Sequence, residues 1–293
     1  MRIGFVGLGV MGAPMAKNLL GGGYHLTVYN RTAARADPLV ARGATRAATL
    51  GELAAASDVV ALMVTDAAAV HAVCDGGDGL LAHLAPGSVI VDFSTIGPAA
   101  TQDLAQSARQ RGVVWMDAPV TGGDVGAKAG TLTIMVGGDA ESFAAIRPLL
   151  DAVGERIVHV GPTGAGQSMK LVGNLVSGLN LLAAAEGIRL AEAAGIPLSA
   201  LTAVLPASSA RSFEVDKLLE RWPARAFAPG FSLANRTKDL GLALDMAEAL
   251  GFPSVLARAA YPAFQQAAAS AGQDDETGVA RHWDTGAGAT PTA

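Results

Sequence analysis

Short apolar runs alternate with longer amphipathic stretches over the first 160 residues. Runs rich in β-branched residues are typical of strands, and apolar residues that recur every three or four positions are typical of helices. The predicted strands are Arg2–Val6, Leu26–Tyr29, Val59–Val64, Val89–Asp92, Val113–Asp117, Thr131–Val136 and Ile157–Val160. Helices are predicted between them, at Met11–Leu20, Ala99–Arg111 and Ala140–Val153. This alternation predicts parallel βαβ units and therefore an α/β fold with a doubly wound sheet.

The pattern changes after the glycine-rich segment 161–166, where the strand signal ends. One long apolar helix is predicted from Gln167 to Ala194, and Gly195 with Pro197 ends it. Further helices are predicted at Leu198–Leu205, Leu233–Leu250 and Val255–Ala269. We therefore expect two domains, residues 1–162 with the sheet and residues 163–293 all helical, joined by the long helix. The last dozen residues are expected to be disordered, because their Gly, Ala and Thr content cannot bury itself.

Composition narrows the class of protein. Of 293 residues 51% are apolar and 16% are charged, which is typical of a globular chain with a large core. The 21 basic and 26 acidic residues give a net charge of −5 without a cationic stripe, so nucleic acid is not an expected partner. The single cysteine excludes an intrachain disulfide, and we expect a cytoplasmic protein. No metal site is expected, since the histidines lie scattered at positions 25, 71, 83, 159 and 282.

No membrane association is expected either. The N-terminal residues have the pattern of a first strand and lack the basic and apolar regions of a signal peptide. The longest apolar stretch, Leu171 to Ala185, lies between Lys170 and Glu186 and contains Asn174 and Asn180. That stretch is shorter than the roughly 18 residues a transmembrane helix needs, so a buried helix is favoured.

A glycine motif follows the first predicted strand and opens the first predicted helix. In Gly-x-Gly-x-x-Gly the first glycine permits a tight turn, the second admits a pyrophosphate and the third lets helix and strand pack closely. The phosphates would then lie at a helix N-terminus. In this context a Rossmann-type dinucleotide site is favoured over a simple glycine-rich turn. The predicted cofactor-binding residues of this loop are Gly7, Leu8, Gly9, Val10, Met11 and Gly12.

The second predicted strand ends at the residues that would face the adenosine ribose, Asn30, Arg31 and Thr32. An NAD-binding chain commonly has an Asp or Glu here. Asn30 is neutral and does not repel a 2′-phosphate, and the Arg31 guanidinium offers several donors to one. NADP is therefore the favoured cofactor, with NAD as the alternative. Arg31 as an ordinary solvated arginine is the competing interpretation.

Four separated motifs resemble those of the β-hydroxyacid dehydrogenase family, which includes 3-hydroxyisobutyrate dehydrogenase, tartronate semialdehyde reductase and glyoxylate/succinic semialdehyde reductases. The resemblance extends over almost the whole chain, to about Thr277. It implies a dinucleotide-binding domain, a helical second domain, and reversible hydride transfer between NAD(P) and a small carboxylated substrate. The motifs are the opening segment 4–20, the Asp-Ala-Pro-Val-Thr-Gly-Gly segment from 117, the Gly-x-x-Gly-x-Gly-x-x-x-Lys-x-x-x-Asn segment from 161, and Lys238-Asp239-Leu240.

The segment Thr121-Gly122-Gly123 follows a predicted strand's carboxyl end, where open α/β sheets bind ligands. Its small residues can offer N–H groups to a carboxylate, and the resemblance implies that the substrate carboxylate binds there. A plain Gly-Gly turn is the alternative. Thr121 replaces a serine that is more frequent in the family, which keeps the hydroxyl and adds a methyl group.

Lys170 lies near the start of the long apolar helix, where a lysine either extends to solvent or is held for a purpose. Hydride transfer to a carbonyl leaves an alkoxide, and an ammonium beside it can stabilise the charge and donate a proton. Asn174, one turn later on the same face, can bind the substrate oxygen or hold the amine. The resemblance implies a catalytic role for Lys170 and a supporting one for Asn174. Gly173 departs from the usual asparagine and suggests an altered pocket.

Three further residues complete the predicted site. Lys238 lies in a predicted helix of the second domain and can approach a carboxylate or the cofactor. Its neighbour Asp239 is left out of the catalytic set, because it can simply stabilise that region. Thr65 and Thr95 follow strand ends where family members approach the nicotinamide, and helix N-caps are the alternative for both.

The leading hypothesis is an NAD(P)-dependent oxidoreductase that interconverts a small 3-hydroxy acid and its semialdehyde. An imine reductase of related architecture and a non-catalytic NADP-binding protein remain as alternatives. The sequence does not identify the substrate. Two substrates that differ by one methylene are distinguished by only about 1–3 kcal/mol, and the residues of the pocket wall that decide this are not evident from the sequence. Self-association through the apolar helical domain, as a dimer or tetramer, is also expected.

Overall fold

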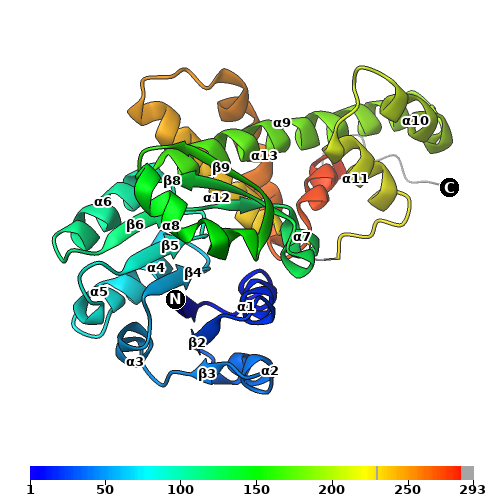
Figure 1. Ribbon diagram of the computed structural model, residues 1–293. Coiled ribbons are helices and arrows are strands. Elements are labelled where there is room, and N and C mark those ends of the chain that lie inside the picture. The colour runs from blue at the N-terminus through cyan, green and yellow to red at the C-terminus, as the bar shows by residue number, and fades with distance from the viewer. Residues whose placement is uncertain (229, 285–293) are drawn as a thin grey trace. The chain divides into compact units, whose positions relative to one another are not determined.

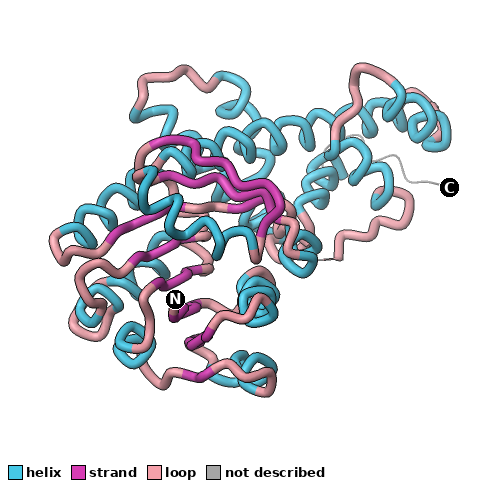
Figure 2. The backbone as a smooth tube through the Cα atoms, viewed as in Figure 1, coloured by secondary structure: helices cyan, strands magenta, loops and turns pink. Residues whose placement is uncertain are grey.

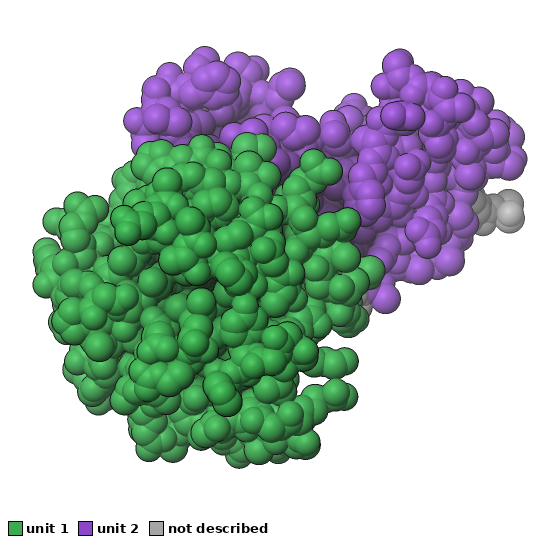
Figure 3. Space-filling model, viewed as in Figure 1, with its two compact units in different colours: residues 1–170 green, residues 171–293 purple. Residues whose placement is uncertain are grey.

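The computed structural model describes residues 1–228 and 230–284 of the chain. These residues belong to two compact units, residues 1–170 and residues 171–293 (Figure 3). The first unit contains the sheet and the second is helical (Figure 1). Mixed α/β architecture with an N-terminal doubly wound sheet and a helical C-terminal region is therefore the observed fold class.

The first unit is built on one sheet of nine strands in the order β3-β2-β1-β4-β5-β6-β8-β7, with β9 paired to β8 (Figure 1). The strands from β3 to β6 are all parallel, in the order that dinucleotide-binding doubly wound sheets adopt. β8 runs antiparallel to β6 and β7. The strands are β1 (Arg2–Val6), β2 (His25–Tyr29), β3 (Thr45–Arg46), β4 (Val59–Leu62), β5 (Val89–Asp92), β6 (Val114–Asp117), β7 (Val120–Thr121), β8 (Leu132–Gly137) and β9 (Gly154–Gly161).

Helices cover both faces of this sheet (Figure 2). Ile3 and Phe5 of β1 pack with residues of α1, α2, α7 and α8, while Val6 packs with residues of α3, α4, α5 and α6. Successive side chains of a strand point to opposite faces, so a buried strand needs apolar residues on both. The helices are α1 (Gly12–Gly21), α2 (Asp37–Val40), α3 (Leu50–Ala55), α4 (Ala67–Cys74), α5 (Leu80–His83), α6 (Pro98–Arg109), α7 (Gly123–Ala129) and α8 (Ala140–Asp151), with the 3-10 helix η1 (Ala33–Ala36).

The second unit packs its helices around a core that includes Leu181, Leu218, Trp222 and Phe264. α12 and α13 pack against each other and against η3. Its elements are the greater part of α9 (Ala165–Ala193), α10 (Leu198–Val204), η2 (Leu205–Ala207), α11 (Phe213–Arg221), α12 (Leu233–Ala249), α13 (Val255–Ala271) and η3 (Glu276–Asp284). Of the described helices, α9 alone is long and apolar enough to span a bilayer, a test that the core helix of a globular protein also passes.

The structure differs from the sequence prediction in four places. β3 and β7 have two residues each, too few to show a periodic pattern, and α2, α3, α4, α5, α7 and α11 were not predicted. The first unit extends to residue 170, eight residues beyond the predicted boundary, because the start of α9 is bonded to the sheet edge. The prediction of a disordered tail from residue 282 is wrong for 282–284, which belong to η3. Residues 285–293 lie outside the described residues.

Candidate active site

The glycine loop between β1 and α1 has a different steric constraint at each glycine. Gly7 has a φ of +95°, and a Cβ there would lie 2.1 Å from the carbonyl oxygen of Met63. A Cβ on Gly12 would lie 1.9 Å from the Gly7 oxygen, whereas one on Gly9 would meet nothing within 4 Å. Gly7 and Gly12 are therefore required by packing, and the space beside Gly9 admits a ligand. Met11 caps α1 without a side-chain hydrogen bond, and the first turn has no acidic residue, which fits a bound pyrophosphate.

Asn30, at the end of β2, supports this loop. Its Oδ1 accepts a hydrogen bond from the Leu8 N–H at 2.9 Å, and its Nδ2 donates to the Thr32 carbonyl at 2.9 Å. The side chain therefore joins the glycine loop to the turn after β2. Arg31 and Thr32 are exposed beside it. The structure thus places the residues predicted to bind the cofactor's phosphates and ribose in two bonded segments of one sheet edge.

The parallel strands end in register. Val6 pairs with both Tyr29 and Leu62, and Asp92 pairs with both Leu62 and Asp117. The segments that follow these strands therefore leave from one carboxyl edge, where doubly wound sheets bind ligands. The glycine loop and the segments with Asn30, Thr65 and Thr95 are among them, so this edge brings together the predicted cofactor-binding residues.

Thr65 and Thr95 are not helix N-caps, which excludes the alternative for both. Asp66 caps α4 by accepting from the Ala69 N–H at 2.8 Å, and Thr65 Oγ1 donates to Asp66 Oδ2 at 3.1 Å. α6 is capped by Gly97. Thr65 is exposed and Thr95 is half-buried.

The predicted substrate loop forms a strand end and a helix start. Thr121 ends β7, where it pairs antiparallel with Thr133 of β8. Gly122 has a φ of +128° and Gly123 a φ of +62°, backbone conformations that favour glycine. A Cβ on Gly123 would meet nothing within 4 Å. The loop is exposed at all three residues, so it is open to a ligand.

The start of α9 is bonded to the same sheet edge. The Asp117 carboxylate at the end of β6 accepts from the Gly164 N–H at 2.7 Å and from the Gln167 N–H at 2.9 Å. Burial raises the pKa of Asp117, and these backbone hydrogen bonds oppose the shift. A Cβ on Gly166 would lie 2.4 Å from the Met135 oxygen, so a glycine there lets the helix approach β8.

Lys170 lies on α9 one turn after Gln167 and is only 9% exposed. A lysine that extends into solvent would expose its end, so the burial favours a held lysine over the solvated alternative. Gln167, which the sequence analysis did not single out, is fully buried. Its side chain bonds to the segment after β5 that contains Thr95. The sequence signal that could have identified Gln167 is its polar side chain within an otherwise apolar helix.

In the second unit, Asp239 joins two of the predicted site residues. The Asn174 amide donates to Asp239 Oδ2 at 2.5 Å, and the Lys238 ammonium lies 2.9 Å from Asp239 Oδ1. Asn174 is 8% exposed and Asp239 is 2% exposed. Asp239 was not among the predicted site residues, and its bond to Asn174 leaves no local pattern in the sequence because 65 positions separate the two residues.

A second buried residue of α12 holds the backbone at Asn174. Arg236, 3% exposed, donates from Nη1 to the Asn174 carbonyl at 2.8 Å and from Nη2 to Ser177 Oγ at 2.8 Å. Its Nε donates to Glu276. Glu214 accepts from Ser177, and burial followed by repulsion from Glu276 raises the pKa of Glu214. This network joins α9, α11, α12 and η3 around the segment that contains Asn174.

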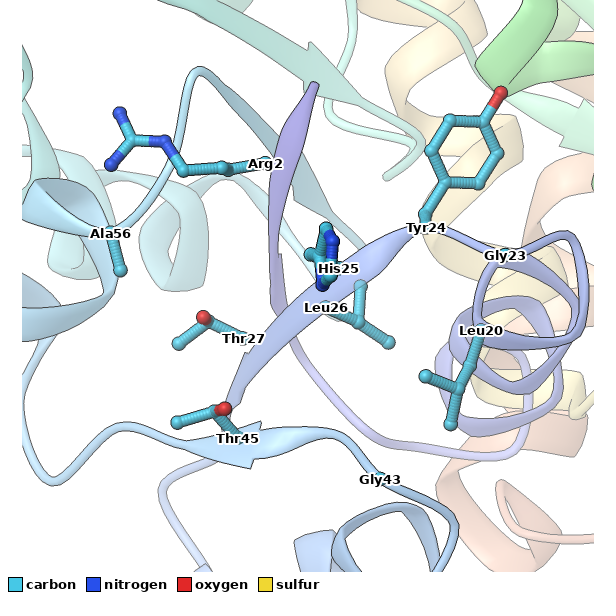
Figure 4. A pocket seen from close by; sticks show the side chains of 10 residues that line it. All are labelled: Arg2, Leu20, Gly23, Tyr24, His25, Leu26, Thr27, Gly43, Thr45 and Ala56. Atoms are coloured by element: carbon cyan, nitrogen blue, oxygen red, sulfur yellow. The ribbon is translucent and has the colours of Figure 1, made fainter.

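One pocket of the described residues lies away from the carboxyl edge of the sheet. A pocket lined by Arg2, His25, Thr27 and Thr45 among others lies at the opposite edge of the sheet, where β1 and β2 begin (Figure 4). Arg2 there is paired with Asp58 at 2.7 Å. The described residues contain no group of three His, Cys, Asp or Glu side chains that could hold a metal ion. The carboxyl edge therefore remains the candidate site of the first unit.

The chain matches known proteins over nearly its full length. Residues 2–161 match the family model of the NAD binding domain of 6-phosphogluconate dehydrogenase. Residues 164–283 match the model described as NAD-binding of NADP-dependent 3-hydroxyisobutyrate dehydrogenase. Both models describe NAD(P)-dependent dehydrogenases, so the chain has a nicotinamide dinucleotide as its cofactor.

Individual relatives agree with this assignment. 2-(Hydroxymethyl)glutarate dehydrogenase of Eubacterium barkeri is 37% identical, over 97% of this chain and 95% of that protein. 2-Hydroxy-3-oxopropionate reductase of Escherichia coli is 40% identical over 85% of each chain. A structure of Mycobacterium tuberculosis 3-hydroxyisobutyrate dehydrogenase with L-serine matches with a TM-score of 0.88 and 32% identity, over 97% of this chain and 99% of that one. This chain therefore belongs to the β-hydroxyacid dehydrogenase family, whose members include 3-hydroxyisobutyrate dehydrogenase and 2-hydroxy-3-oxopropionate reductase.

Proposed function

We propose that this protein interconverts a small 3-hydroxy acid and its semialdehyde, with Lys170 as the general acid and base. The observation that supports this most directly is the placement of Lys170. It is buried on a helix whose start is bonded to the carboxyl edge of the dinucleotide-binding sheet. Burying an ammonium group costs free energy. A buried lysine at this edge therefore favours a functional role for it.

The bound nicotinamide supplies or accepts the hydride, and the protein groups position the substrate and move the proton. In the reductive direction the Lys170 ammonium donates a proton to the oxygen that was the carbonyl. In the oxidative direction the neutral amine takes the proton from the substrate hydroxyl. One group performs both steps because the reaction passes through the same transition state in either direction.

We assign the substrate carboxylate to Thr121, Gly122 and Gly123, whose exposed loop offers a hydroxyl and backbone N–H groups. Lys238 is a further substrate-binding residue in this proposal, and Asn174 supports Lys170. Substrates in the names of the relatives fit this assignment. 3-Hydroxyisobutyrate, L-serine and 2-(hydroxymethyl)glutarate each have a hydroxyl on the carbon β to a carboxylate.

NADP is the cofactor that the adenosine end favours. Asn30 is neutral, it is bonded to the glycine loop and the turn, and exposed Arg31 follows it directly. The Arg31 guanidinium can bind a 2′-phosphate, and the neutral amide of Asn30 does not repel one as a carboxylate would. The glycine loop, with the segments of Thr65 and Thr95, holds the rest of the dinucleotide in this proposal.

The test is an absorbance assay of nicotinamide turnover with the purified protein. NADPH and then NADH are offered with 2-hydroxy-3-oxopropionate and other semialdehydes, and NADP and NAD with 3-hydroxyisobutyrate, L-serine and 2-(hydroxymethyl)glutarate. We expect turnover with at least one β-hydroxy acid or its semialdehyde, and a faster rate with NADP or NADPH than with NAD or NADH. Cofactor binding without turnover on the whole panel would contradict the proposal and favour an imine substrate or a non-catalytic role.

A further inference from the structure

Gln167 connects the start of α9 to the segment after β5 through its side chain. Oε1 accepts from the Ile96 N–H at 3.0 Å and from the Gly97 N–H at 3.1 Å, and Nε2 donates to the Ser94 carbonyl at 2.8 Å. The residue is 0% exposed. All three bonded backbone groups flank Thr95, so one amide fixes this turn from both sides.

The same residue is fixed through its own backbone. The Gln167 N–H donates to Asp117 Oδ2, and Ser94 Oγ in turn accepts from the Val64 N–H at 3.0 Å. A chain of buried and half-buried hydrogen bonds therefore runs from Val64, just after β4, through Ser94 and Gln167 to Asp117 at the end of β6. Buried polar groups that are bonded in this way resist movement, because a shifted arrangement leaves a donor or acceptor unpaired.

Lys170 follows Gln167 by three residues in α9. Three residues rise about 4.5 Å along an α-helix and return to nearly the same face. Only one helical turn therefore separates the lysine from Gln167. The side chain of Gln167 in turn bonds directly to the backbone around Thr95.

We propose that Gln167 is a positioning residue for the reaction, and that it holds Lys170 at a fixed distance from the turn of Thr95 on which the nicotinamide end rests. This inference rests on the proposed function of Lys170. Gln167 itself touches neither substrate nor cofactor in this account. Its effect is to keep the proton donor aligned while the hydride moves.

A purely structural role predicts something different. Asp117 already accepts from the N–H of Gly164, just before α9, and from that of Gln167 in its first turn, so the helix start keeps these bonds when the Gln167 side chain is changed. Loss of a structural bond would lower stability and leave the chemical step of the folded enzyme as it was. Loss of alignment would slow the chemical step by about a hundredfold for a displacement of about 1 Å.

The experiment compares Gln167→Met, which keeps the length and removes the hydrogen bonds, with Gln167→Asn, which keeps the amide and shortens it by one methylene. Gln106→Met on the exposed face of α6 is the matched control. For each variant we would measure NADPH affinity, KM, kcat, the hydride isotope effect with deuterated NADPH, and the solvent isotope effect in D2O. Melting curves and NADPH binding identify folded variants, and the milder Asn variant serves if the Met variant does not fold.

We expect kcat to fall by about a hundredfold in the Gln167 variants, with NADPH affinity and KM nearly unchanged. The solvent isotope effect should rise while the hydride isotope effect falls, because a misplaced lysine makes proton donation limiting. Wild-type kcat, or unchanged isotope effects, in folded Gln167 variants would overturn the inference and leave the proposed function intact. Full activity of Lys170→Ala would instead overturn the function on which the inference rests.

Discussion

The Asn174 amide donates to the Asp239 carboxylate at 2.5 Å, and both residues are buried. An ionised carboxylate is only an acceptor, so the bond requires the NH2 group of Asn174 to face Asp239. The amide oxygen of Asn174 is then an acceptor available for a hydroxyl or an ammonium. Under the proposed function we therefore expect Asn174 to support the reaction by accepting a hydrogen bond and not by donating one.

Asp239→Asn should therefore reduce turnover, because the new amide can also bind Asn174 in the reverse orientation. We expect kcat to fall about tenfold, equivalent to about 1.4 kcal/mol in the barrier. The same change in an Asn174→Ala background should have little further effect, since Asp239 acts through Asn174. Asp245→Asn, on the exposed side of α12, is the matched control. Additive losses in the double variant would show that Asp239 acts independently of Asn174.

Two substitutions in the glycine loop should have opposite effects on stability and binding. Gly12→Ala puts a Cβ 1.9 Å from the Gly7 oxygen, so we expect a loss of about 1–3 kcal/mol in the free energy of unfolding. Gly9→Ala meets no atom of the protein within 4 Å, so its stability should change by less than about 1 kcal/mol. The NADPH affinity of Gly9→Ala should nevertheless fall strongly, because the added methyl group occupies the space expected for the pyrophosphate. Chemical denaturation and fluorescence titration measure the two effects, and tight NADPH binding by Gly9→Ala would refute the loop assignment.

Arg31 should determine the preference between the two cofactors. Arg31→Ala removes a charged donor from the expected 2′-phosphate position, so NADPH affinity should fall by roughly tenfold to a hundredfold while NADH affinity stays constant. Arg42→Ala, also exposed, is the control. Equal losses for both cofactors would indicate a role for Arg31 outside phosphate recognition.

Asp117 should make stability depend on pH in the acidic range. Burial raises its folded-state pKa above the ordinary value of 3.8, so the folded protein binds its proton more tightly than the unfolded chain does. This contribution to stability is fully present below pH 3.8 and is lost as the pH rises through the folded-state pKa. Asp117→Asn should remove that loss. Denaturation curves at several pH values, compared between the two proteins, test the sign, and a difference that grows in the opposite direction would refute it.

Self-association should depend on the apolar side chains that α9 exposes. Met169, Val172, Val176 and Leu190 are 44–69% exposed on this helix. We expect a second copy of the chain to cover part of this surface, because exposed apolar rows favour symmetric association. Sedimentation of the wild-type protein should show a dimer or tetramer, and a Val172→Glu, Val176→Glu double variant should be monomeric. Val40→Glu in the first unit serves as control, and a monomeric wild-type protein would contradict the expectation.

The features predicted correctly from the sequence are those that leave a local pattern of residues. Long periodic segments such as 98–109 and 233–249 were found to within a few residues, and the glycine motif lies where the prediction placed it. Two-residue strands such as β7 have no periodicity to detect. Gln167 and Asp239 were missed for a different reason. Their importance comes from partners that are about 65 to 73 positions away in the sequence, and only folding brings such residues together.

In the proposed reaction buried Lys170 moves the proton. The most direct measurement is the single-turnover rate of NADPH oxidation by Lys170→Ala at saturating cofactor and substrate, beside Lys128→Ala, an exposed lysine on α7. Loss of a general acid is worth about a hundredfold to ten-thousandfold in rate. We predict a loss of that size for Lys170→Ala with NADPH affinity unchanged and the wild-type rate for Lys128→Ala, whereas a wild-type rate in Lys170→Ala would contradict the account.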